Sequence, residues 1–104
     1  MPMGFEGVLL SDVLAKVDAP FGEKFHKSAP SYYVVAEGKD GYRAVYAWGE
    51  VDPGYTERVI LLAVRADGKP LSGTIGPLRV VVGDDKDHGR WVRQLTTLRI
   101  KQAD

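Results

Sequence analysis

Cysteine is absent from this chain of 104 residues, and long apolar runs are absent as well. Without cysteine the chain can form no disulfide, no thiolate metal site and no cysteine nucleophile. No stretch approaches the roughly 20 apolar residues of a membrane-spanning helix, so we expect no membrane span. The N-terminal residues include neither a basic nor an apolar region typical of signal peptides, and we expect no signal peptide in this chain.

The chain also lacks net charge and the usual catalytic patterns. Fourteen basic residues balance fourteen acidic ones, so nothing overall favours an anionic membrane or nucleic acid. Aromatic residues lie on predicted strands with Arg43 as the one interleaved basic residue, which also disfavours nucleic acid as a partner. His26 and His88 belong to no metal-binding spacing, and no serine lies in a Gly-x-Ser-x-Gly context. We therefore assign no catalytic residue and no metal ligand.

Turn-forming residues are abundant, with twelve glycines and six prolines. The length suits a single domain over residues 1–104, and frequent turns favour strands over long helices. One helical pattern covers residues 7–17. Its apolar face is formed by residues three and four positions apart: Leu10, Val13, Leu14 and Val17. We expect Ser11 or Asp12 to cap this helix and Pro20 to end it.

The rest of the chain predicts strands. They cover five segments rich in β-branched, aromatic or apolar residues: 32–37, 42–47, 59–64, 78–82 and 95–101. The first two are four residues apart and form a predicted hairpin, while the third is apolar throughout and should be buried on both faces. Residues 21–30 have mixed character, residues 48–54 form a predicted connector, and residues 66–70 a turn. The predicted fold class is α+β, mostly β, with a mixed or antiparallel sheet and one or two short helices.

Positive charge gathers near the C-terminal end. Residues 76–101 contain six basic and three acidic residues. Arginine suits planar, bidentate contacts with phosphate or carboxylate, and Arg90 and Arg93 flank Trp91. Two interpretations are open: an oxyanion-binding patch, or ordinary arginines on a solvated strand edge. The oxygen-rich residues 84–88 lack a calcium-binding spacing and are predicted to form a polar turn.

Several short motifs, taken in order, resemble the molybdopterin-binding domain of the sulfite oxidase family, and most of all its small bacterial stand-alone members. They are GV at 7–8, LSD at 10–12 with Leu14, DGY at 40–42, LLA at 61–63, DGKPL at 67–71, GPLRVVV at 76–82 and RWVR at 90–93. The resemblance covers nearly the whole chain, but only the C-terminal portion of that domain. It implies a partial sulfite-oxidase-like fold and an oxidoreductase-like origin. It also favours the bacterial periplasm.

The resemblance implies molybdopterin as the cofactor. Arg79, Arg90, Trp91 and Arg93 match the segments that line the family's cofactor pocket, with Arg93 in the place of a basic cofactor contact. In the enzymes, a cysteine from an earlier part of the domain ligates molybdenum. This chain has no cysteine, so we expect no metal to be bound by this chain alone.

Three functions remain open. The first, which the absence of cysteine and the arginine cluster favour, is a non-catalytic binding or accessory module with a patch that accepts an anion or a pterin. The second is a part of a molybdopterin-dependent oxidoreductase that missing sequence or a partner completes. The third is a structural or interaction domain. A truncated sheet would leave an exposed edge, which favours pairing with a second copy, so we also expect a homodimer through that edge.

Overall fold

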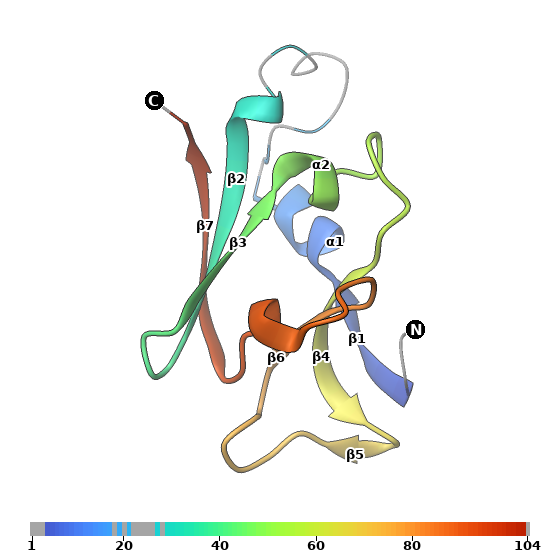
Figure 1. Cartoon of the computed structure of the whole chain (residues 1–104). Coiled ribbons are helices and arrows are strands. Elements are labelled where there is room, and N and C mark those ends of the chain that lie inside the picture. The colour runs from blue at the N-terminus through green and yellow to red at the C-terminus, as the bar shows by residue number, and fades with distance from the viewer. Residues whose placement is uncertain (1–3, 18, 20, 22–26, 28, 104) are drawn as a thin grey trace.

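The computed structural model describes residues 4–17, 19, 21, 27 and 29–103. It has two antiparallel sheets with two short α-helices beside them (Figure 1). The strands are β1 (Phe5–Leu9), β2 (Tyr32–Gly38), β3 (Arg43–Ala47), β4 (Ile60–Ala66), β5 (Lys69–Pro70), β6 (Arg79–Val82) and β7 (Leu95–Gln102). The helices are α1 (Leu10–Ala15) and α2 (Trp48–Val51), and two 3₁₀ turns are η3 (Ala29–Ser31) and η4 (His88–Arg90). The predicted class, α+β and mostly β, is confirmed.

The first sheet has the strand order β3-β2-β7. Strands β2 and β3 form the predicted hairpin, with Val35 opposite Val45. Strand β7 pairs with the other side of β2, with Val35 opposite Arg99. Alternate residues of β2 and β3 are buried, whereas Arg43 and Val45 face solvent, as expected for a sheet with one solvated face.

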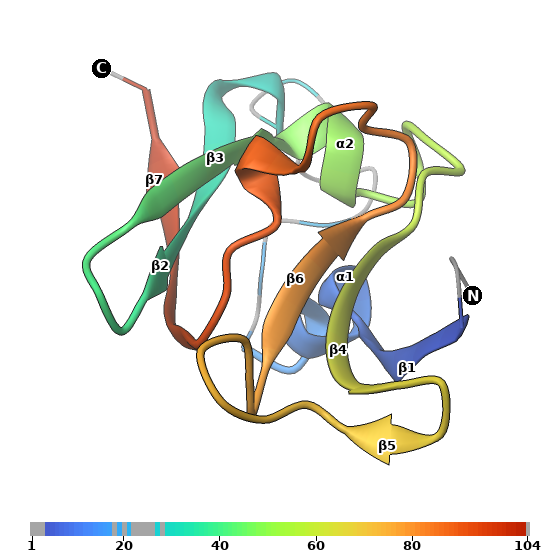
Figure 2. The ribbon, with the colours of Figure 1, turned by 60° about the horizontal axis from the view of Figure 1, so that its bottom comes forward.

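The second sheet is centred on β4. Strand β1 pairs with one side of β4, and β6 and the two-residue β5 pair with the other (Figure 2). Leu61 therefore lies between Leu9 and Val81. Residues 60–63 are all buried, which confirms the centre of the strand predicted to be covered on both faces. Its end residues Val59 and Val64 are 37% and 45% exposed, so the prediction is wrong there.

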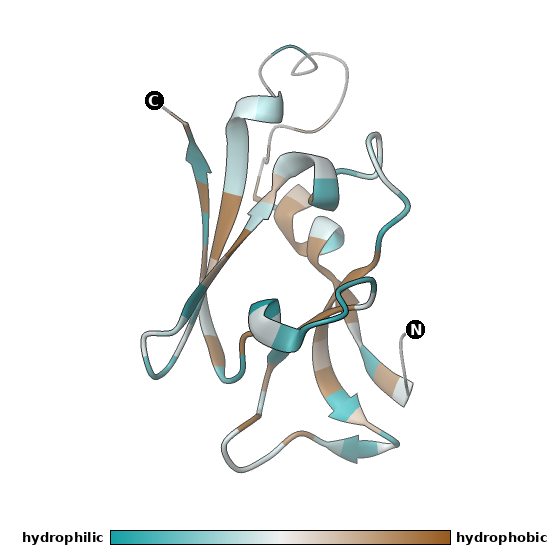
Figure 3. Cartoon of the chain, viewed as in Figure 1, coloured by the Kyte–Doolittle hydropathy of each residue, from teal (hydrophilic) through white to brown (hydrophobic). Residues whose placement is uncertain are grey.

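One apolar core joins the two sheets and the helices. Its largest fully buried side chains are Trp48, Tyr46, Leu10 and Leu61. Figure 3 shows hydrophobic residues along β2, α1 and β4. Residues 91–95 also link the sheets through backbone hydrogen bonds. The Val80 amide donates to the Val92 carbonyl at 2.9 Å, and the Lys39 amide donates to the Gln94 carbonyl at 2.9 Å.

The predicted helix over residues 7–17 is wrong at both ends, because the helix ends at Ala15 with Lys16 as its C-cap, well before Pro20. Residues 7–9 belong to strand β1, and the helix begins at Leu10 with Leu9 as its N-cap and no side-chain cap, so neither Ser11 nor Asp12 caps it. Leu10 and Leu14 are buried as predicted, but Val17 is 63% exposed. Residues 7–9 form a strand because they pair with β4. Gly7 allows this pairing, because it lies against the Leu62 backbone where a Cβ atom would be 2.0 Å from the carbonyl oxygen.

Two other segments contain more structure than the sequence predicted. The connector over residues 48–54 includes helix α2, whose Trp48 is buried in the core. The turn over residues 66–70 includes β5. In the predicted mixed segment 21–30, residues 22–26 and 28 lie outside the described residues, as does His26.

Candidate functional site

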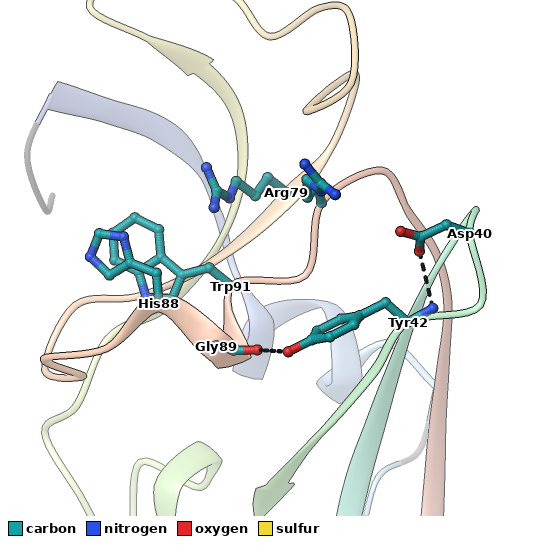
Figure 4. Close-up of a pocket in the computed structure, with 7 residues that line it drawn as sticks. Asp40, Tyr42, Arg79, His88, Gly89 and Trp91 are labelled. Carbon is teal, nitrogen blue, oxygen red and sulfur yellow. Dashed lines mark hydrogen bonds between the residues drawn. The ribbon is translucent and has the colours of Figure 1, made fainter.

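A pocket of about 240 Å³ lies where the β2–β3 turn, the start of β6 and the η4 turn approach one another. Figure 4 shows its labelled side chains, with Asp40 and Tyr42 on one side and His88 and Trp91 on the other. The pocket is lined by Asp40, Tyr42, Arg79, His88, Gly89, Trp91 and Arg93. Two guanidinium groups face one carboxylate there, so the pocket is positively charged when His88 is neutral.

Arg79 is the most unusual group in this pocket. Its Nε atom is buried and has no hydrogen-bond partner among the described residues. Burial, followed by repulsion from the nearby Arg93 cation, lowers the pKa of Arg79. No carboxylate of the described residues forms an ion pair with Arg79 or Arg93. Because a buried donor without a partner is unfavourable, this pair of cations favours an anion.

The Arg79 guanidinium also lies over the indole of Trp91, with Cζ 5.3 Å from the ring centroid. This is within the range of a cation–π contact. Residue 79 opens strand β6 opposite Ala63, so the sheet fixes its backbone. The strand thereby places one arginine head at the pocket wall.

Trp91 and His88 form the aromatic wall. The imidazole of His88 is stacked on Trp91 with a centroid distance of 3.7 Å and an interplanar angle of 11°. Trp91 is only 5% exposed, and its Nε1 donates to the Val82 carbonyl at 3.0 Å. The edge of Phe5 packs on the same indole at 5.7 Å. The indole is therefore fixed from three directions, whereas His88 is exposed.

The opposite wall comes from the β2–β3 turn. The Tyr42 amide donates to Asp40 Oδ1 at 3.0 Å, which holds the carboxylate in the turn. The Tyr42 hydroxyl donates to the Gly89 carbonyl (Figure 4). This bond ties the hairpin of one sheet to the η4 turn, so the pocket depends on the relative position of the two.

Arg90 lies elsewhere. It does not line the pocket, and all five of its N–H donors are used within the protein. They reach Asp85, Glu50 and the Val45 carbonyl. The predicted polar turn over residues 84–88 ends one residue early, because His88 begins η4. Asp87 Oδ1 accepts from the Gly89 amide at 2.8 Å and caps η4.

The structure thus brings together three of the four residues that the sequence proposed. Arg79, Trp91 and Arg93 line one pocket, and Arg90 points into a separate ion-pair cluster. Sequence reasoning did not assign Asp40 or His88 to the site. The sequence did contain a signal for Asp40, because Asp40 begins the DGY motif at 40–42, one of the motifs that carry the family resemblance. His88 was weighed only as a metal ligand.

The described part of the chain offers neither a cluster of metal ligands nor a membrane-spanning helix. No group of three or more His, Cys, Asp or Glu side chains there could hold a metal ion. No helix among those residues has the length and apolar character needed to cross a membrane.

A family model described as the oxidoreductase molybdopterin binding domain matches residues 1–104. No curated protein matches the chain.

Proposed function

The chain belongs to the oxidoreductase molybdopterin-binding domain family, and from this premise we propose that it is a non-catalytic binding module for an anionic, pterin-type ligand. The proposed contacts are Arg79 and Arg93 for the anionic group and the Trp91–His88 wall for the planar ring. A single observation carries the proposal: the buried Nε of Arg79 has no partner among the described residues, beside a second arginine that lacks an acidic partner there.

The side chains of the pocket fit the organic part of molybdopterin. Its phosphate would accept hydrogen bonds from Arg79 and Arg93, because charged N–H···O contacts are short and strong. A planar pterin would lie near Trp91 and His88, and the free oxygen of Asp40 could accept from ring N–H groups. The metal fits less well, because the chain supplies no cysteine thiolate. Any thiolate ligand for molybdenum would have to come from another chain or segment.

Arg90 has a different place in this proposal from the one the sequence suggested. With five donors already engaged, it has none to offer an added phosphate. We therefore restrict the proposed ligand contacts to Arg79, Trp91 and Arg93, supplemented by Asp40 and His88.

Family membership also supports a second candidate, a part of a molybdopterin-dependent oxidoreductase that a partner or further sequence completes. A module of either kind would need the same anion contacts. The two differ in whether the purified protein contains stoichiometric molybdenum. A purely structural or interaction domain would need neither metal nor pterin.

The experiment is isothermal titration calorimetry of the purified chain with a phosphorylated pterin, unphosphorylated pterin and inorganic phosphate as separate probes. We expect the phosphorylated pterin to bind most tightly. Removing a charge-assisted arginine contact costs about 1.5–3 kcal/mol, so Arg79→Ala and Arg93→Ala should each weaken binding by roughly tenfold or more. Arg65→Ala is the matched control, because Arg65 is exposed on β4 and does not line the pocket.

Equal binding by wild type and an Arg79→Ala/Arg93→Ala double variant would overturn the proposed site. Metal analysis of the protein as purified distinguishes the two candidates. Stoichiometric molybdenum would contradict the non-catalytic module and support the second candidate, a part of an oxidoreductase.

A further inference from the structure

We propose that Arg90 is a positioning residue, which together with Glu50 and Asp85 holds the η4 turn in place and so gives the pocket its shape. The three side chains are called the Arg90 cluster below. The inference rests on the proposed function of the pocket for its effect on ligand binding. Its effect on the geometry of η4 stands independently.

The hydrogen bonds of Arg90 are complete. Its Nε and one Nη2 donor reach the two oxygens of Asp85, each at 2.9 Å. Its Nη1 and Nη2 reach the two oxygens of Glu50 at 2.9 and 2.7 Å. The remaining Nη1 contact is with the Val45 carbonyl at 3.2 Å. Two bidentate carboxylates on one guanidinium fix both its position and its plane.

These contacts connect segments that are far apart in the sequence. Glu50 lies on α2, Val45 lies on β3, and Asp85 lies in the loop that precedes η4. Tyr46 contributes from the same strand, because its hydroxyl donates to the Arg90 carbonyl and its ring lies 5.3 Å from Arg90 Cζ. Arg90 is therefore held at both its backbone and its side chain.

The cluster is only partly exposed to water. The side chains of Arg90, Glu50 and Asp85 are 29%, 22% and 18% exposed. Hydrogen bonds from Arg90 lower the pKa of Glu50 and of Asp85, so both carboxylates are charged at neutral pH. Partial burial and a shared cation make such a network stronger than isolated surface ion pairs.

The link to the pocket is the chain itself. Arg90 stands between Gly89 and Trp91, which both line the pocket, and His88 lies one residue further back. Residues His88 to Arg90 are one 3₁₀ turn, whose only side-chain cap is Asp87. A three-residue turn has little stability of its own. Releasing Arg90 would therefore loosen the stacking of His88 on Trp91.

The test replaces each carboxylate by the uncharged amide of the same shape and measures the NMR signals of the His88 ring. An imidazole 3.7 Å above an indole has carbon-bound protons shifted upfield by the ring current. Proton NMR of wild type and of His88→Ala assigns these signals without any ligand. We expect Asp85→Asn and Glu50→Gln to move them toward the position of an unstacked histidine.

The same variants should weaken binding of phosphorylated pterin by roughly three- to tenfold, while circular dichroism shows the native fold. Arg90→Lys should keep only part of the wild-type binding, because an ammonium group has three donors and no planar fork. Arg58→Ala is the matched control. Arg58 forms ion pairs with Glu50 at 3.3 Å and Asp84 at 3.9 Å at the rim of the cluster, and neither of these partners belongs to η4.

The outcomes separate the two proposals. If the folded carboxylate variants keep the wild-type His88 signals, the positioning role is overturned. If the signals move as expected but wild type binds none of the three probes, the positioning role stands and the proposed function fails. If Arg58→Ala moves the signals as much as Asp85→Asn, the effect is one of general charge and the specific role of Arg90 is overturned.

Discussion

At the scale of single residues, Arg79 and Arg90 show how surroundings decide the use of one residue type. Arg90 meets two carboxylates and a carbonyl. Arg79 meets an indole face and a second arginine, and its buried Nε finds no acceptor among the described residues. The first arrangement stabilises the protein without a ligand, whereas the second is improved by an added anion.

Acid pH should weaken the fold through the Arg90 cluster. Hydrogen bonds from Arg90 lower the pKa of Glu50 and Asp85 in the folded state, so the unfolded chain binds more protons around pH 4. Their stabilising contribution is present above about pH 4 and is lost as pH falls further through the depressed folded values. We expect urea unfolding to show a free energy that decreases from about pH 5 to about pH 3.

The variant for this prediction is Arg90→Met, which removes the cation. Its free energy of unfolding should decrease less between about pH 5 and about pH 3 than that of wild type. Some decrease should persist, because Arg99 also lowers the pKa of Glu37. Arg65→Ala should retain the full wild-type slope. An identical slope in Arg90→Met and wild type would contradict the prediction.

Tyr46 should resist ionisation in the folded protein. Burial is the main cause that raises its pKa well above the usual tyrosine range, and its side chain is fully buried in the core. Folded wild type and Tyr46→Phe should therefore form the same number of tyrosinates up to about pH 11. Ultraviolet absorbance during a pH titration measures this number. After unfolding in urea, wild type should form one more tyrosinate than the variant. A difference already present in the folded state would contradict this.

At the scale of elements, β1 depends on the lack of a side chain at residue 7. A Cβ atom at Gly7 would lie 2.0 Å from the Leu62 carbonyl oxygen and 2.8 Å from the Cα of Ala63. Both atoms are backbone of β4 at the centre of its sheet. Strand β1 can relieve such a clash only by moving away from β4, which would disrupt their shared hydrogen bonds.

We expect Gly7→Ala to lower the free energy of unfolding by about 2 kcal/mol or more, in the range of strongly destabilising substitutions. Gly49→Ala on α2 is the matched control, because a Cβ there meets no atom within 4 Å. A helical position free of clashes gains about 0.5–1 kcal/mol from this exchange. Chemical unfolding of both variants provides the measurement, and equal stabilities would refute the close approach of β1 to β4.

The N-terminal segment also shows where element prediction from sequence succeeds and fails. The apolar spacing of Leu10 and Leu14 correctly predicted a helix, because both face the core. The same pattern extended too far back, because residues 7–9 gain more from pairing with β4 than from another helical turn. Such pairing partners lie more than fifty positions away in the chain, and a local pattern contains no information about them.

At the scale of the whole molecule, the two edge strands of the three-stranded sheet, β3 and β7, differ in what covers them. In the three-stranded sheet, β3 is covered at the Val45 carbonyl by Arg90. Strand β7 pairs with β2 on one side only among the described residues. The predicted homodimer through a sheet edge stays a prediction, and β7 is the edge on which we now place it.

Two antiparallel copies of β7 would bring Arg99 and Lys101 near their counterparts. Added salt screens such like charges, so we expect self-association that strengthens from low to high ionic strength. Analytical ultracentrifugation over a range of concentrations measures this. Lys101→Thr should already strengthen association at low salt. A single monomeric species under all conditions would rule out the dimer.

The sequence alone determined the class of fold, the hairpin, the buried centre of strand β4 and the resemblance that the family match confirmed. These features depend on local patterns of apolar and turn residues and on the order of short motifs. It also singled out Arg79, Trp91 and Arg93, which the structure brings to one pocket.

Only the tertiary structure decided what surrounds each of these side chains. It stacked His88 on Trp91 and brought Asp40 to the opposite wall of the same pocket. It also paired Arg90 with Glu50, which is forty positions away. The physical reason is that a guanidinium binds whichever acceptors the folded chain brings within hydrogen-bond distance. Spacing in the sequence shows which arginines are neighbours along the chain, but the packing of the two sheets determines which of them can still bind an anion.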